Sequence, residues 1–315
     1  MRVILASPRG FCAGVNMAIE SLELALRVFG RPVYVYHEIV HNRWVVEHFR
    51  RQGAVFVDDL DAVPEGSHLL YSAHGISPEV RQQAAARRLK TVDATCPLVI
   101  KVHHEALRFA RDGYTIVLIG HEGHDEVIGT MGEAPEAIRL VGSIEDVDRL
   151  EITDSSRIAY LTQTTLSVDD ARQIIARLVE RFPAIQGPRK DDICYATQNR
   201  QEAVRALCRE ADVTLVVGSQ NSSNSQRLAE VSRSCGVAAH LIDSAADIDP
   251  GWFLPGSTVL VTAGASAPET LVVECVEWLA ARFGATVETR ILKTEEVHFA
   301  LPRELRAAAA GTPSG

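Results

Sequence analysis

The sequence lacks any apolar run of the roughly 20 residues that a helix needs to cross a bilayer. Its N-terminus, MRVILASPRG, has only a four-residue apolar run before Pro8, so it lacks the build of a secretory signal peptide. No window combines a Lys/Arg stripe with interleaved aromatics, and the formal net charge is -9, which argues against nucleic acid as a partner. We therefore expect a soluble, cytoplasmic protein that binds neither membranes nor nucleic acid.

Several short motifs are also missing. The chain has no G-x-x-x-x-G-K-[ST] and no well-placed G-x-G-x-x-G, so binding of ATP or NAD has no support. Its 6 cysteines include no C-x-x-C pair and lie far apart in a 315-residue chain, which is large enough to fold without disulfides. In a reducing compartment, such cysteines are more often metal ligands, catalytic groups or core residues than bridges.

What the sequence does contain is an alternation of short β-branched runs and amphipathic helical stretches, the pattern of parallel βαβ units. The clearest helical stretch covers residues 14–29 and ends at Gly30. Ser77 followed by Pro78, and Ser167 with Asp170, are typical helix starts. The expected strands cover residues 2–6, 33–36, 68–72, 115–120, 214–218 and 258–262.

A coarse internal repeat follows from three cysteine-containing strings, GFCAGV, ATCPLV and DICYAT, each of which precedes a helical pattern. The three cysteines lie 84 and 98 residues apart, which predicts three similar α/β domains with mainly parallel sheets. The expected domains cover residues 1–96, 97–193 and 194–290, followed by a C-terminal tail over residues 291–315. From about Ala307 the tail has no partner pattern, so we expect it to be mobile.

Three of the cysteines stand at expected helix starts, where partial positive charge favours the thiolate that binds metal. Cys12, Cys96 and Cys194 are therefore candidate metal ligands, although burial as small core residues is an equally good interpretation. By contrast, Cys208 and Cys275 fall on apolar helix faces and are expected in the core. Residue types alone do not separate an iron–sulfur cluster from zinc bound by three thiolates and a histidine.

Polar loops follow several of the expected strands, at the edge where parallel sheets collect ligands. Hydroxyls, an amide, histidines and helix N-terminal N–H groups together can bind phosphate without a lysine, so a diphosphate is a plausible ligand. Glu126, in GHEGHDE, is the best candidate for a general acid, although a solvated loop acid is the plainer alternative. The other candidates are His41, His74, His124, Ser222, Ser223, Asn224 and Ser266. Taken singly, each is more often a cap, a turn residue or a packed histidine.

Nine strings occur in an order that makes the chain recognisable. They are PRGFCAGV, HEIVHNRWVV, SAHGIS, DATCPLV, IGHEGHDEV, LTQTTLSVDD, GPRKDDICYAT, GSQNSSNS and TAGASAP. From Met1 to about Arg306, the sequence closely resembles the 4-hydroxy-3-methylbut-2-enyl diphosphate reductase family, the final enzymes of the non-mevalonate isoprenoid pathway.

The resemblance implies a trefoil of three α/β domains around a central 4Fe-4S cluster, with Cys12, Cys96 and Cys194 as ligands and one iron left open. It implies that Glu126 supplies a proton and that Thr164 lies close to the substrate hydroxyl, so that Glu126, Thr164 and His124 form the catalytic set. Ferredoxin or flavodoxin would deliver the electrons. The implied substrate-binding residues are His41, His74, His124, Thr164, Ser222, Ser223, Asn224 and Ser266.

One loop departs from the family pattern, because Glu122 and Asp125 stand where many relatives have Ala and Pro. We expect both acids to point into solvent, since buried carboxylates facing a diphosphate would repel it by several kcal/mol. Two other functions remain open from the residues: a cluster-dependent hydro-lyase, which needs no external electrons, and a non-enzymatic cluster sensor. Activity without reductant would favour the first, and tight binding of an allylic diphosphate would count against the second.

Overall fold

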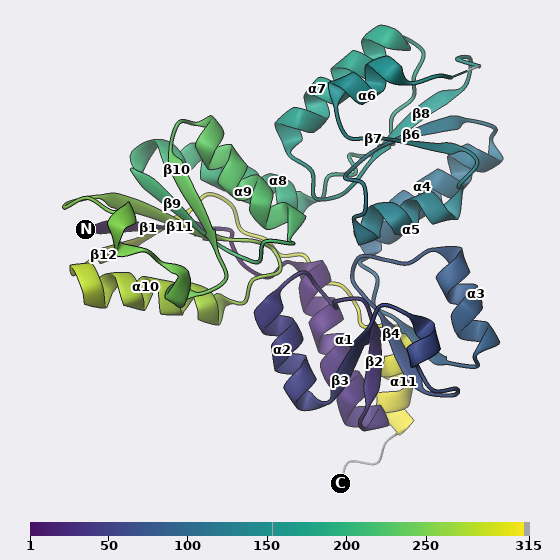
Figure 1. The fold of residues 1–315 in the computed structure, drawn as a ribbon, viewed down its shortest axis with the longest axis horizontal. Coiled ribbons are helices and arrows are strands. Elements are labelled where there is room, and N and C mark those ends of the chain that lie inside the picture. The colour runs from purple at the N-terminus through teal and green to yellow at the C-terminus, as the bar shows by residue number, and fades with distance from the viewer. Residues whose placement is uncertain (153, 312–315) are drawn as a thin grey trace. The chain divides into compact units, whose positions relative to one another are not determined.

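The structure, a computed structural model, describes residues 1–152 and 154–311. Its strands form three sheets in which the neighbouring strands run parallel (Figure 1). This confirms the expected α/β class with mainly parallel sheets. The chain divides into two compact units. Unit 1 consists of Met1–Val15, His41–His48 and Tyr195–His298, and unit 2 consists of Asn16–Val40, Phe49–Cys194 and the described residues from Phe299 on. The trefoil arrangement stays a prediction.

Unit 1 contains a five-stranded sheet in the order β10-β9-β11-β1-β12. Its strands are β1 (Arg2–Ser7), β9 (Val213–Val217), β10 (Ala238–Ile242), β11 (Thr258–Ala263) and β12 (Thr286–Ile291). Its helices are α8 (Tyr195–Leu207), α9 (Ser223–Ser234) and α10 (Glu269–Phe283), with short 3-10 turns at Cys208–Glu210, Ala245–Asp247 and Pro250–Trp252.

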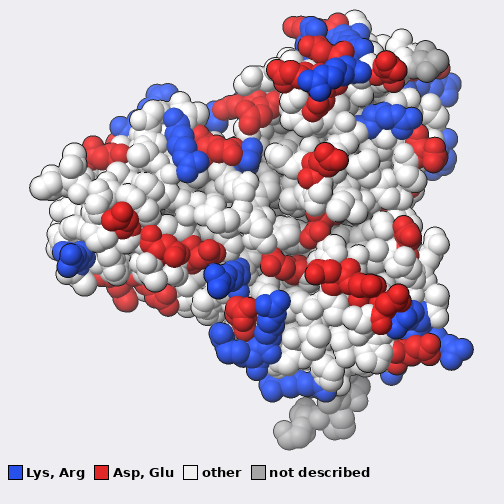
Figure 2. Space-filling model, viewed as in Figure 1, with Lys and Arg blue, Asp and Glu red and all other residues white. Residues whose placement is uncertain are grey.

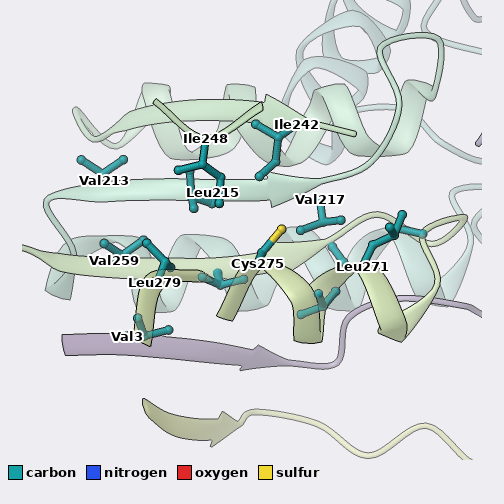
Figure 3. Packing of buried hydrophobic residues seen from close by; sticks show 14 of the residues in the cluster. Val3, Val213, Leu215, Val217, Ile242, Ile248, Val259, Leu271, Cys275 and Leu279 are labelled. Atoms are coloured by element: carbon teal, nitrogen blue, oxygen red, sulfur yellow. The ribbon is translucent and has the colours of Figure 1, made fainter. Parts of the chain in front are cut away.

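Both faces of this sheet are covered by helices, because successive strand side chains point to opposite sides. Val3 packs with Leu271, Cys275 and Leu279 of α10 (Figure 3). Its neighbour Ile4 packs in a second cluster with residues of α8 and α9. The sheet is therefore doubly wound, and its strand ends are free to carry polar loops.

Unit 2 contains two smaller parallel sheets, in the orders β3-β2-β4-β5 and β7-β6-β8. The strands of the first are β2 (Val33–Tyr36), β3 (Ala54–Val57), β4 (His68–Tyr71) and β5 (Lys90–Asp93). Those of the second are β6 (Thr115–Ile119), β7 (Ile138–Val141) and β8 (Ile158–Thr162). Two helices, α1 (Ala13–Phe29) and α2 (Arg43–Gln52), contain residues of both units. The other described helices of unit 2 are α3 (Pro78–Ala86), α4 (Pro97–Arg111), α5 (Asp125–Glu133), α6 (Ile144–Arg149), α7 (Val168–Arg181) and α11 (Arg303–Gly311), with a 3-10 turn at Leu60–Ala62.

Local sequence signals account for several helix boundaries. Ser77 caps α3 by accepting a hydrogen bond from the Val80 N–H, with Pro78 in the first turn. Ser167 caps α7 in the same way, and Gly30 follows α1 with a left-handed φ of 77°. These boundaries confirm the helix starts and the stop that the sequence predicted.

The two ends of the chain differ from expectation. Strand β1 pairs with β11 and β12. Both neighbours lie outside residues 1–96, so the expected first domain does not contain the strands that pair with its own first strand. Val3 is fully buried and needs cover from that sheet. At the other end, helix α11 and buried Leu305 occupy part of the expected tail, so the prediction of a patternless tail is wrong up to residue 311. The division into three domains stays a prediction.

No helix among the described residues is long and apolar enough to span a membrane. Figure 2 shows basic side chains lying among acidic ones over the face in view.

Candidate functional site

Three cysteines begin helices, as the sequence predicted. Cys12 immediately precedes α1, Cys96 is the N-cap residue of α4, and Cys194 immediately precedes α8. All three are half-buried and none forms a disulfide. Each backbone N–H is fixed by a carbonyl oxygen, and the partners of Cys12, Cys96 and Cys194 are Ala265 at 3.2 Å, Ala73 at 3.0 Å and Thr164 at 3.0 Å. The thiols are thus held at the positive ends of helices.

The remaining cysteines have different surroundings. Cys208 and Cys275 are buried in the two clusters that cover the faces of the unit 1 sheet, which confirms the prediction that they are core residues. Burial raises the pKa of both thiols to about 12. At neutral pH these thiols are protonated and are poor metal ligands.

A buried carboxyl lies against a hydroxyl in unit 2. Glu126, in the first turn of α5, is 1% exposed. Its Oε1 accepts a hydrogen bond from the Thr164 N–H at 2.6 Å, and its Oε2 accepts one from the Thr164 hydroxyl at 2.9 Å. Thr164 follows β8, and the segment that follows β6 leads into α5, so adjacent strand ends bring the two residues together.

The environment of Glu126 sets its protonation. Burial raises the pKa of this carboxyl to about 7, although both hydrogen bonds from Thr164 lower it and the charge of Asp192 raises it further. Burial is the largest of these effects because a desolvated carboxylate is unfavourable. At neutral pH the group is therefore divided between a form that can donate a proton and a form that can accept one.

Two candidate histidines of unit 2 lie near Glu126. His124 is the N-cap residue of α5, and its Nδ1 accepts a hydrogen bond from the Glu126 N–H at 3.2 Å. A neutral His124 ring therefore carries its proton on Nε2. The rings of His74 and His124 meet edge to face, with centroids 6.0 Å apart, and His74 Nδ1 lies 3.4 Å from the Ser72 hydroxyl. His74, His124, Glu126 and Thr164 thus form one neighbourhood.

The acids of this loop do not both point into solvent. Glu122 is exposed, as expected, but the expectation for Asp125 was wrong. One oxygen of Asp125 lies 2.8 Å from His37 Nδ1, and the other lies 3.9 Å from His74 Nδ1. The hydrogen bond to Asp125 raises the pKa of His37 against the opposing effect of burial. Asp125 is thus not an unpaired carboxylate, because His37 forms a hydrogen bond with it.

The hydroxyl and amide candidates of unit 1 form a second neighbourhood. Asn224 donates to the Ser222 hydroxyl at 2.9 Å, and Ser222 and Ser266 hydroxyls lie 3.3 Å apart. Ser266 donates to the His41 carbonyl at 2.9 Å, and Asn224 accepts from the Ala265 N–H at 2.6 Å. Ser223 begins α9 beside them. Small hydroxyls at a helix N-terminus provide donors suited to phosphate oxygens.

The candidates are thus divided between the two units. Unit 1 holds Cys12, His41, Ser222, Ser223, Asn224 and Ser266, and unit 2 holds Cys96, Cys194, His74, His124, Glu126 and Thr164. That they form one site stays a prediction.

Two supporting residues were missed by sequence reasoning. Lys101 and Asp192 hold the segment that leads to Cys194, and both lie close in sequence to a candidate ligand. The sequence signal was the string KDDIC, a charged run directly before a candidate ligand. In the structure the Asp192 side chain of this run is fully buried, which is unusual for a carboxylate.

The fold and these residues define a parallel α/β protein with cysteines at helix starts and a buried acid–hydroxyl pair at strand ends. The model of the LytB protein family matches residues 3–280, and the chain belongs to that family. A relative from Rhodopirellula baltica is 63% identical over 310 residues, covering 98% of this chain and 97% of its own. A relative from Mycobacterium leprae is 54% identical over 308 residues, covering 98% of this chain and 93% of its own. Both are named 4-hydroxy-3-methylbut-2-enyl diphosphate reductase.

Two solved structures are also similar. One is described as the E-1-hydroxy-2-methyl-but-2-enyl-4-diphosphate reductase from Plasmodium falciparum. It is 40% identical with a TM-score of 0.96, covering 98% of both chains. The other is described as (E)-4-hydroxy-3-methyl-but-2-enyl diphosphate reductase, the terminal enzyme of the non-mevalonate pathway. It is 30% identical with a TM-score of 0.64, covering 89% of this chain and all of the other.

Proposed function

We propose that this chain catalyses the reductive dehydroxylation of (E)-4-hydroxy-3-methylbut-2-enyl diphosphate to isopentenyl and dimethylallyl diphosphates. The observation that carries the proposal is the buried Glu126–Thr164 pair, with a carboxyl pKa of about 7. A removable hydroxyl needs a nearby acid that is partly protonated at neutral pH, and this pair provides one. Membership of the LytB family and the names of the relatives support the same reaction.

The reaction consumes two electrons and two protons. The bond between carbon and the hydroxyl oxygen breaks, and one proton converts the hydroxyl into water. The second proton forms a C–H bond at either end of the allylic system, which accounts for two isomeric products. The chain must therefore bind the diphosphate, position the hydroxymethyl group, and deliver protons away from bulk water.

We propose that Cys12, Cys96 and Cys194 hold a 4Fe-4S cluster. The donor set fits, because three half-buried thiols stand at helix N-termini and none is consumed by a disulfide. Zinc bound by the three thiolates and by a histidine or a water is the alternative, and metal analysis of the purified chain distinguishes the two. When bound, the cluster supplies electrons and a Lewis-acidic iron.

Glu126 holds the proton that leaves with the hydroxyl. When its carboxyl is protonated, Oε2–H donates to the Thr164 hydroxyl oxygen, and the Thr164 hydroxyl in turn donates to the substrate oxygen. The 2.9 Å separation between Glu126 Oε2 and Thr164 Oγ1 suits this transfer. Because Glu126 is buried, the proton comes from the protein rather than from solvent.

The diphosphate binds to the two polar neighbourhoods. His74 and His124 supply N–H donors from unit 2, while His41, Ser222, Ser223, Asn224 and Ser266 supply donors from unit 1. Asp125 lies beside His74, so its pairing with His37 matters for the affinity of an anionic ligand. Electrons arrive one at a time from a ferredoxin or a flavodoxin in the cytoplasm.

An anaerobic turnover assay with purified chain tests the function. The chain should be brown, contain four irons and four sulfides, and convert the substrate only when a one-electron reductant is present. Conversion without reductant would favour the cluster-dependent hydro-lyase. A colourless protein that binds zinc would remove the basis for the proposed cluster.

A further inference from the structure

Arg200 is the largest of the fully buried side chains, with an exposed fraction of 1%. It lies on α8, the helix that follows Cys194, and none of the proposed steps uses it. A buried guanidinium is unfavourable unless every N–H group has an acceptor.

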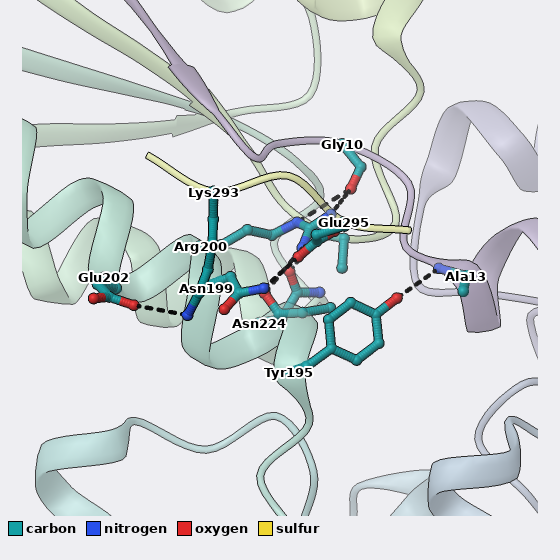
Figure 4. Close-up of polar contacts among 11 residues, drawn as sticks. Gly10, Ala13, Tyr195, Asn199, Arg200, Glu202, Asn224, Lys293 and Glu295 are labelled. Carbon is teal, nitrogen blue, oxygen red and sulfur yellow. Dashed lines mark hydrogen bonds and ion pairs between the residues drawn. The ribbon is translucent and has the colours of Figure 1, made fainter. Parts of the chain in front are cut away.

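All five N–H groups of Arg200 have acceptors. Nε and Nη2 donate to the Gly10 carbonyl oxygen at 3.2 and 2.7 Å. Nη1 donates to the Ala196 carbonyl at 2.9 Å and to Glu295 at 3.1 Å, and Nη2 also donates to Glu295 at 3.3 Å. Figure 4 shows the guanidinium between Gly10 and Glu295. The charge is thus neutralised by one carboxylate, and the fork is directed at one backbone oxygen.

Glu295 is held in place by a second neighbour. The Asn199 side chain donates to Glu295 Oε1 at 2.9 Å, and the Glu295 side chain is 14% exposed. Asn199 and Arg200 are successive residues of α8, so the helix presents both donors to the same carboxylate (Figure 4). Held by Asn199, the Glu295 carboxylate orients the Arg200 guanidinium toward the Gly10 carbonyl oxygen.

The target of Arg200 is the loop that ends at Cys12. Gly10 has a left-handed φ of 66°, and a Cβ built on it would lie 3.3 Å from the Ala267 carbonyl, so the loop conformation requires glycine. Two residues later, the Cys12 N–H donates to the Ala265 carbonyl at 3.2 Å. The next N–H, that of Ala13, donates to the Tyr195 hydroxyl at 3.2 Å (Figure 4).

Both contacts from α8 thus flank Cys12 in sequence. Arg200 binds the carbonyl two residues before the cysteine, and Tyr195 binds the N–H one residue after it. The Tyr195 hydroxyl oxygen accepts this hydrogen bond, and its ring comes from the first turn of the same helix. The thiol-bearing turn is therefore fixed from both sides by one helix.

We infer that Arg200, oriented by Glu295 and assisted by Tyr195, is a positioning residue that fixes the Gly10–Ala13 turn and with it the thiol of Cys12. The effect of Arg200 on metal binding rests on the proposed cluster, whereas the effect of Arg200 on the conformation of the turn does not. Residues that orient metal ligands typically change metal affinity by about 10-fold to 100-fold when they are replaced.

Hydrogen–deuterium exchange of the full-length, metal-free chain tests the turn itself. Arg200→Lys keeps the charge and the pairing with Glu295 but loses the fork, and Arg200→Met loses both. In each variant, exchange of the peptide covering residues 8–16 should become about 10-fold to 100-fold faster, because a charge-assisted hydrogen bond is lost. Exchange of the strand at residues 213–217 should stay within about twofold of wild type. Tyr195→Phe should accelerate exchange of residues 8–16 to a smaller extent. This variant replaces an Arg200 variant in the test if that variant does not fold.

Leu279→Ala is the matched control. Leu279 is fully buried in the core of the same unit and makes no hydrogen bond to the turn, so its truncation lowers stability without removing Arg200. It should accelerate exchange of both peptides alike or of neither. Unchanged exchange at residues 8–16 in Arg200→Lys, or equal acceleration of both peptides, would overturn the inference.

The second measurement follows the cluster. After anaerobic reconstitution, iron should leave Arg200→Lys about 10-fold to 100-fold faster than wild type in a chelator, while Leu279→Ala should release iron at the wild-type rate under conditions where it stays folded. Equal release from Arg200→Lys and wild type would refute the effect on metal. If wild-type chain binds no iron, the proposed cluster fails, and the exchange experiment still decides whether Arg200 fixes the turn.

Discussion

The ammonium of Lys101 lies 2.9 Å from Asp192, whose side chain is fully buried two residues before Cys194. Lys101 also donates to the carbonyls of Lys190 and Asp191 at 2.5 and 3.0 Å, so its three N–H groups are all used. The other Asp192 oxygen accepts the Thr162 N–H at 3.0 Å. Since Lys101 lies on α4, which begins after Cys96, this pair connects the two cysteine segments of unit 2.

Replacement of Lys101 by Met should therefore destabilise the chain. An unpaired carboxylate would remain buried, and breaking such a pair typically lowers the free energy of unfolding by about 3 kcal/mol. Urea unfolding of the metal-free protein, followed by circular dichroism, measures this change. In the double variant Lys101→Met/Asp192→Asn, the loss should be smaller than the sum of the two single losses.

Lys293→Met provides the control for this experiment. Lys293 pairs with Glu202 at 3.4 Å, but both side chains are more than half exposed, so its removal should change the free energy of unfolding by at most about 0.5 kcal/mol. If Lys101→Met unfolds at the same urea concentration as Lys293→Met, the connection between the two segments does not stabilise the fold.

Replacement of Glu126 by Gln should reduce turnover far more than substrate binding. The amide keeps the shape and a hydrogen bond to Thr164 but cannot supply a proton, so kcat should fall by about 10²-fold to 10⁴-fold, while KM should change by less than about threefold. Steady-state kinetics with an artificial reductant measures both constants.

Glu122→Gln is the matched variant in the same loop. Glu122 is exposed, so its replacement should leave kcat within about twofold of wild type. A comparable fall in kcat and rise in KM for Glu126→Gln would contradict the assigned role in proton transfer.

The sequence predicted the central strands and missed the edge strands. Strands β1, β2, β4, β6, β9 and β11 were expected, and each has a neighbour on both sides. A central parallel strand is buried on both faces and reads as a continuous apolar run. Edge strands such as β5, KTVD, and β12, TVETRI, are partly exposed and carry charges, so their sequences resemble loops.

The site was predictable in its parts but not in its connections. Cysteines at helix starts and polar residues after strands carry local signals, which is why Cys96 and His124 could be named from sequence. The contact between Glu126 and Thr164 joins residues 38 positions apart, and that between Lys101 and Asp192 spans 91. Such contacts depend on strand order, which short motifs do not encode.

The raised pKa of Glu126 predicts how stability depends on pH. Between its ordinary value of 4.5 and the folded value of about 7, the folded chain binds more protons at this site than the unfolded chain does. The contribution of Glu126 to the free energy of unfolding is therefore highest below about pH 4.5 and declines by about 3 kcal/mol as pH rises to about 7. The difference between wild type and Glu126→Gln, measured by urea unfolding across this range, should follow that decline.

An unchanged difference between the two proteins across this range would mean that Glu126 titrates normally in the folded chain. The hydrogen bonds from Thr164 would then stabilise its ionised form as strongly as burial destabilises it. Glu122→Gln, which changes an exposed carboxyl of the same loop, is measured beside Glu126→Gln as the control.

The contact between Asp125 and His37 makes a prediction for the titration of the histidine. Asp125→Asn removes the charge beside His37, so the pKa of His37 should fall from its raised value. NMR titration of isotope-labelled histidines, assigned with His37→Gln, measures this shift. Because a raised pKa stabilises the fold at low pH and the effect fades as pH rises through the folded value, Asp125→Asn should lose stability mainly on the acidic side. Glu122→Gln should leave the His37 titration unchanged, and an unshifted His37 in Asp125→Asn would show that the 2.8 Å contact is not an ion pair in solution.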